Sequence, residues 1–143
     1  MNEEAKSMIL AAIAAAVLFF VYTFVQGFLA LYVVAGINAV KSMLGYRGAT
    51  LFIIYTFGVL GSALSAMLIN IPLGLLLTGR PWVIGAAVGV AVAVALALIY
   101  ANMARNSFAD SVTVAEVASL IIFSSLAAGL GNRMKRDNAS TRP

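Results

Sequence analysis

The chain has no cysteine and no histidine among its 143 residues. Without cysteine it forms no disulfides and no thiol centre, and without either residue it has no zinc site of the usual Cys/His kind. The absence of histidine also removes the most common general acid–base group of enzymes. The sequence therefore predicts a non-enzymatic protein with no catalytic residue, no cofactor and no metal site.

Charged residues are also scarce in the sequence. Charged residues make up 10% of the chain and hydrophobic residues 63%, with nine Lys and Arg against five Asp and Glu. Soluble domains carry about 25% charged and roughly 45–50% apolar residues. Nucleic-acid binding needs a basic face with interleaved aromatic residues on a soluble surface, and the cations here lie instead near the ends of apolar runs. The expected partner is the lipid bilayer, with no nucleic acid.

The apolar residues gather in four long runs, at about 8–36, 51–77, 82–103 and 114–130. Each run is near or above the roughly 17–25 residues that a helix needs to cross a bilayer. The expected fold class is therefore an all-α integral membrane protein, a compact four-helix transmembrane bundle with up-down topology and short loops. Residues 1–136 form a single transmembrane domain, and 137–143 form a flexible polar tail.

The segment between the first two runs is not featureless. Ile37, Val40, Met43 and Leu44 fall near helical spacing with polar residues between them, which is typical of a short helix lying in the membrane interface. With four spans, both termini share one side. That side carries six Lys or Arg and the other side three, so the positive-inside rule favours cytoplasmic termini. The expected location is the bacterial cytoplasmic membrane.

Small residues recur every four positions in the third run, which indicates a smooth helix face for close packing. The second run offers further small residues as a counterpart, and so does the fourth. This close packing lies either within one bundle or at a seam between copies or other membrane helices. The predicted packing residues are Gly58, Gly61, Ser62, Ser65, Gly85, Gly89, Ala93, Ala97, Ser125 and Gly129.

Polar residues within the runs are few and neutral. They serve either as hydrogen-bonding contacts between helices or as the lining of a polar path through the bundle. The predicted path residues are Gln26, Asn70 and Ser119. We expect Gln26 to face the bundle with Ser62 or Ser65 as its partner. The aromatic residues of the first run, Tyr22 among them, are spread around the helix and are expected to face lipid.

The segment Thr113-Val114-Ala115-Glu116 matches the capping box, in which a Thr side chain and a Glu three residues later bond to amides at a helix start. If Thr113 caps the fourth helix, Glu116 lies only about 4–5 Å from the helix start, at the interface. The alternative is a buried functional acid. The capping interpretation removes the best candidate for chemistry in the chain.

These features favour an accessory or structural membrane subunit, or a self-associating bundle, that acts through helix–helix packing. The alternative is a small oligomeric transporter, channel or holin-like pore with a path near Gln26, Asn70 and the serines of the spans.

Overall fold

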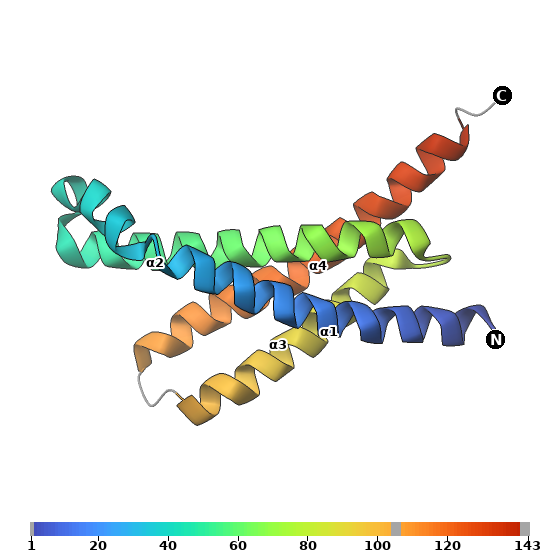
Figure 1. Cartoon of the computed structure of the whole chain (residues 1–143), viewed down its shortest axis with the longest axis horizontal. Coiled ribbons are helices and arrows are strands. Elements are labelled where there is room, and N and C mark those ends of the chain that lie inside the picture. Colours follow the sequence, from blue (N-terminus) through green and yellow to red (C-terminus); the bar gives the residue numbers. More distant parts are fainter. Residues whose placement is uncertain (1, 104–106, 141–143) are drawn as a thin grey trace.

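The computed structural model describes residues 2–103 and 107–140, with side chains for 2–99 and 114–140. Its four helices are α1 (Glu3–Ala30), α2 (Val33–Leu76), α3 (Pro81–Met103) and α4 (Ser107–Ser140), and the described residues contain no strand (Figure 1). The Asn2 side chain caps α1 by accepting a 2.8 Å hydrogen bond from the Ala5 amide. The all-helical class expected from the sequence is confirmed.

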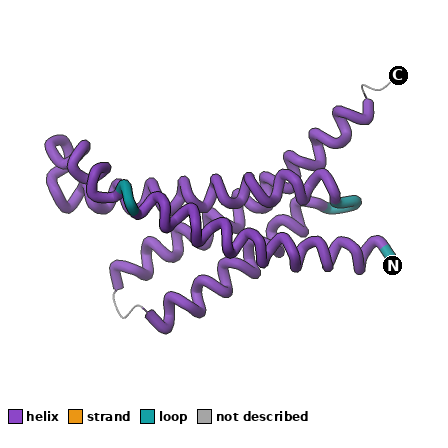
Figure 2. Tube along the Cα trace, viewed as in Figure 1, coloured by secondary structure: helices purple, strands orange, loops and turns teal. Residues whose placement is uncertain are grey.

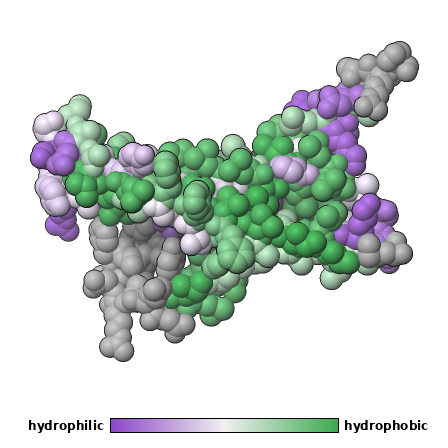
Figure 3. Space-filling view, viewed as in Figure 1, coloured by the Kyte–Doolittle hydropathy of each residue, from purple (hydrophilic) through white to green (hydrophobic). Residues whose placement is uncertain are grey.

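All four helices contain a stretch that is long and apolar enough to cross a membrane, by length and composition. Figure 3 shows apolar surface over the middle of the molecule, with hydrophilic residues gathered at both of its long ends. This distribution matches the expectation of a multi-pass membrane protein.

The helices alternate in direction, and both termini lie at the same end of the bundle (Figure 1). The described connections are short: Leu31 and Tyr32 join α1 to α2, and residues 77–80 join α2 to α3 (Figure 2). In the second turn Gly79 has φ of 100°, a conformation that glycine adopts without steric penalty. The most extensive contacts are those of α4 with α2 and α3.

The long helix α2 is broken at Gly45, where φ is 69° and ψ is 167°. Residues 33–44 therefore form a short helix that folds back beside the start of the long part of α2, at the left of Figure 1. A small apolar cluster of Ile37, Ala49 and Ile53 joins the two parts. A short helix was expected over residues 37–50, and the structure places it four residues earlier and ends it at the glycine.

The fourth helix differs most from expectation. It begins at Ser107, so Thr113 lies in its seventh position and cannot be its N-cap. The predicted helix cap formed by Thr113 and Glu116 is therefore wrong as a helix start, and the side chain of Thr113 lies outside the described residues. The helix also continues ten residues past the predicted end at Leu130, through the first four residues of the predicted tail.

The main core lies where α1, α3 and α4 meet the end of α2. From α1 it takes Ala14, Leu18 and Tyr22, which recur every four residues and form one stripe. It is completed by Leu73, Leu77, Val88, Val92, Leu96 and Leu120. Asn132 and Lys135 of α4 donate hydrogen bonds of 3.2 and 3.3 Å to the carbonyl of Leu77, which ends α2.

Glycines allow α3 and α4 to approach closely. A Cβ atom added at Gly85 would clash with the carbonyl of Ser124, and one at Gly89 would lie 2.8 Å from the Cα of Ile121. The partner of the small-residue face of α3 is thus α4 rather than α2. At the other interface of α4, a Cβ at Gly74 or Gly131 would clash with backbone, of Ala128 and Ile71 respectively.

The other predicted packing residues differ in how deeply they are buried. Gly58, Gly61, Ser62, Ser65 and Ala93 are buried, whereas Ser125 and Gly129 are half-buried. Ala97 is exposed, so the packed part of the α3 stripe ends one turn earlier than predicted. Ser125 donates a 3.0 Å hydrogen bond to the carbonyl of Trp82 and so also joins α4 to α3.

We predict that Gly89→Ala lowers the free energy of unfolding by about 1–3 kcal/mol, because the added methyl forces two backbones apart. The matched control is Gly27→Ala, where nothing lies within 4 Å of the new Cβ. Because alanine is the better helix former by about 1 kcal/mol, the control should be neutral or stabilising. Unfolding in mixed micelles measures both. Equal stability of the two variants would show that α3 and α4 are not in close contact at Gly89.

Candidate functional site

A carboxylate lies inside the bundle. Glu116 occupies the tenth position of α4, and its Oε2 accepts a 2.8 Å hydrogen bond from the hydroxyl of Tyr22 on α1. Tyr22 is buried and Glu116 is half-buried. The bond joins residues 94 positions apart in the sequence, so the carboxylate is positioned by tertiary packing and not by a local turn.

The depth of this pair follows from helix geometry. Glu116 lies nine residues from the start of α4, and Tyr22 lies eight residues from the end of α1. At 1.5 Å per residue these separations are about 14 and 12 Å along the helix axes. Both residues therefore lie within their helices and not at a helix end. Among the described residues, the stretch of α4 that is apolar enough to cross a membrane begins at Val114, two residues before Glu116.

Two glycines of α2 provide space for the polar groups. A Cβ at Gly58 would lie 2.9 Å from Oε1 of Glu116, and a Cβ at Gly61 would lie 2.6 Å from Nε2 of Gln26. The Gln26 amide donates a 3.1 Å hydrogen bond to the carbonyl of Gly58. Gln26 therefore faces α2 as expected, but its partner is a backbone carbonyl rather than Ser62 or Ser65.

Ser62 joins the same cluster. Its hydroxyl lies 2.9 Å from the carbonyl of Gly58 in its own helix and 3.4 Å from the carbonyl of Glu116. We name Tyr22, Gln26, Ser62 and Glu116 the carboxylate cluster. It brings together α1, α2 and α4 around one ionisable group.

Further polar residues follow along α2 toward the end of the bundle that carries the termini. Ser62 and Ser65 lie on the same helix face as Gly58, because the intervals are four and three residues, whereas Asn70, five residues after Ser65, is turned by about 120° from Gly58. Asn70 is fully buried and donates 3.1 Å hydrogen bonds to the carbonyl of Ala66 and to Ser124 of α4. Its carbonyl oxygen Oδ1 accepts no hydrogen bond from any described residue.

Of the predicted path residues, Gln26 thus contacts α2 at the carbonyl of Gly58, and Asn70 lies twelve residues farther along α2. Ser119 is buried and donates a 2.7 Å hydrogen bond to the carbonyl of Ala115 in its own helix. Ser65 likewise bonds to its own helix, at the carbonyl of Gly61. Such bonds leave the lone pairs of the serine oxygen free to accept a hydrogen bond.

The cluster contains no cation among the described residues, since no Lys or Arg in that part of the chain is paired with Glu116. A lone carboxylate in an apolar bundle is costly unless it is protonated, hydrogen-bonded or paired with a cation. The described residues also contain no group of three or more Asp, Glu, His or Cys that could hold a metal ion. One ionisable group with neutral donors is suited to a proton or a single small cation.

Sequence reasoning missed two members of this site. Tyr22 was expected to face lipid, and Glu116 was assigned to a helix start. The spacing of Tyr22 from Ala14, Leu18 and Gln26 by multiples of four would have placed it on the inward stripe.

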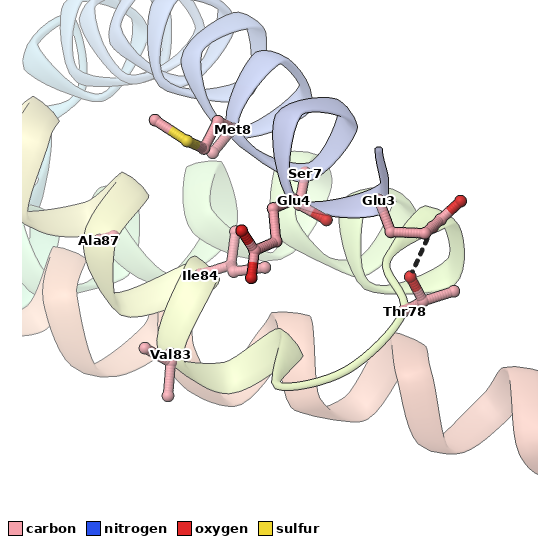
Figure 4. Close-up of a pocket in the computed structure, with 9 residues that line it drawn as sticks. Glu3, Glu4, Ser7, Met8, Thr78, Val83, Ile84 and Ala87 are labelled. Atoms are coloured by element: carbon pink, nitrogen blue, oxygen red, sulfur yellow. Dashed lines mark hydrogen bonds between the residues drawn. The ribbon is translucent and has the colours of Figure 1, made fainter. Parts of the chain in front are cut away.

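Two cavities lie at the end of the bundle that carries the termini. One, of about 380 Å³, lies between the start of α1 and the start of α3 (Figure 4). Most of its lining is apolar. Glu3, which also lines it, accepts a 2.9 Å hydrogen bond from Thr78, and this bond joins α1 to the turn before α3. The other cavity is basic and lies between α3 and α4.

Comparison with protein-family models, with curated protein sequences and with solved structures finds no match for this chain.

Proposed function

We propose that the chain is a small multi-pass membrane transporter or channel in which Glu116 binds a proton or a small monovalent cation. The observation that carries this proposal is the 2.8 Å hydrogen bond from Tyr22 to a carboxylate inside the bundle. An ionisable residue within a membrane-spanning bundle indicates function by default, because burying it opposes stability.

The hydrogen-bonding capacity of the cluster supports this role. A deprotonated carboxylate accepts from the tyrosine hydroxyl, and a protonated one can also donate. Tyr22 is therefore suited to hold the side chain in place in both states. The second carboxylate oxygen, Oε1, lies against Gly58, where a Cβ atom would be only 2.9 Å away.

An ion path across the bundle needs several polar groups along its length. The buried residues Ser62, Ser65 and Asn70 of α2 supply hydroxyl and amide groups over about 12 Å toward the end of the bundle that carries the termini. The unpartnered Oδ1 of Asn70 is an acceptor of the kind that coordinates cations or hydrogen-bonds to water. These groups support a route along the α2–α4 interface.

We predict that Glu116→Gln abolishes ion-dependent flux through the purified chain in proteoliposomes. The protein should fold as before, since the glutamine oxygen still accepts from Tyr22. The assay imposes a pH, sodium or potassium gradient and follows each with a trapped fluorescent indicator. Glu4→Gln, which removes an exposed carboxylate of α1, is the matched control and should retain full flux.

Wild-type chain that moves none of these ions would contradict the transport proposal.

A second function would then be favoured, that of an accessory subunit. The observation in its favour is an apolar groove of about 540 Å³ on the outer face of α2 and α4, lined by Tyr55, Val59, Leu60 and Phe123 among others. A membrane helix of another protein, or of a second copy, fits such a groove.

We further propose that the chain resides in the bacterial cytoplasmic membrane with both termini in the cytoplasm, because six of the nine Lys and Arg lie on that side. The short helix 33–44 and the turn at Gly45 then lie at the opposite interface.

The chain has no native cysteine, so single cysteines can be placed at the exposed positions Ser140 and Ser42. An impermeant thiol reagent added to intact cells should label Ser42→Cys and not Ser140→Cys. The reverse pattern would overturn the orientation.

A further inference from the structure

We propose that the basic cavity between α3 and α4 binds the phosphate of an anionic phospholipid headgroup. The cavity has a volume of about 390 Å³, and its lining includes Trp82 of α3 and Asn132, Arg133 and Arg136 of α4. This site is separate from the carboxylate cluster, and the proposal does not depend on transport.

The two arginines are placed for joint contact with one anion. Positions three apart share a helix face, and here both residues line the same cavity. Like charges at this spacing repel one another, so an anion between them would relieve the repulsion. Guanidinium groups bind phosphate through paired, charge-assisted hydrogen bonds, which makes phosphate the anion of choice.

The third nearby cation does not compete for this role. Lys135 donates its hydrogen bond to the carbonyl of Leu77 and so serves to end α2. The amide of Asn132 also donates toward that helix end, to the carbonyls of Gly74 and Leu77. These bonds fix the last turns of α2 beside α4, and Arg133 and Arg136 remain available to a ligand.

The surroundings of the cavity favour a lipid over free phosphate. Trp82 lines the cavity and is 58% exposed, as is typical of tryptophan at the level of lipid headgroups. Two leucines on the turns of α4 before Arg133, Leu126 and Leu130, are also exposed. They offer an apolar surface for the acyl chains of a lipid. The cavity lies at the end of the bundle that carries the termini, where a basic pocket between helices meets anionic headgroups.

The single tryptophan of the chain provides a direct probe, because it lines the cavity. The purified full chain in a non-ionic detergent is titrated with dihexanoyl-phosphatidylglycerol while Trp82 emission is followed. We expect saturable binding that is about 10- to 30-fold weaker in the double variant Arg133→Gln/Arg136→Gln. Both arginines are exposed, so the variant should fold normally. Circular dichroism checks this.

The matched control is Lys6→Gln/Arg80→Gln, which removes two exposed positive charges at the same end of the bundle but outside the cavity. It should bind within about three-fold of the native chain, because short-range contacts rather than net charge hold the ligand. Equal weakening by both double variants would overturn the proposal in favour of general charge attraction. Binding that neither variant changes would overturn it as well.

Two further titrations separate the possible sources of the phosphate. Zwitterionic dihexanoyl-phosphatidylcholine should bind at least about ten-fold more weakly than the anionic lipid, because its choline group repels the guanidinium pair. Inorganic phosphate alone should bind more weakly still, since it lacks the acyl chains. An arginine-dependent response to inorganic phosphate with none to the anionic lipid would overturn the lipid assignment.

Discussion

The interior of this bundle depends on one hydrogen bond between the hydroxyl of Tyr22 and the carboxylate of Glu116. An isolated carboxylate in apolar surroundings would cost far more than any single packing contact returns. The bond to Tyr22 and the space at Gly58 make its burial tolerable. Because the bond joins α1 to α4, it also fixes the rotation of both helices about their axes.

Close packing and the polar cluster use the same residue type for different purposes. Gly85 and Gly89 let the backbones of α3 and α4 approach each other, as Gly74 and Gly131 do for α2 and α4. Gly58 and Gly61 instead leave space that a carboxylate and an amide fill. A substitution at the first kind of glycine displaces a helix. At the second kind it displaces a flexible polar side chain, so function is affected before stability.

The coarse architecture could be predicted because it follows from composition. Four apolar runs of membrane-spanning length admit only a helical bundle, and the four-residue recurrence of small residues in α3 marked its packed face. The start of α4 could not be found in this way. The capping-box match at Thr113 lies inside α4, which begins six residues earlier at Ser107. This earlier start places Glu116 in the tenth position of the helix and not in its first turn. The contact with Tyr22 depends on how α1 rotates against α4, which no local pattern determines.

The most direct test is a double-mutant cycle on this pair, measured as free energy of unfolding in mixed micelles. Tyr22→Phe and Glu116→Leu each leave one partner without its hydrogen bond, while the double variant replaces both partners by apolar groups. The account predicts that the double variant is more stable than the sum of the single effects by about 1.5–3 kcal/mol, the range for a hydrogen bond to a charged group. Additivity of the two changes to within about 0.3 kcal/mol would contradict the contact and, with it, the buried carboxylate site.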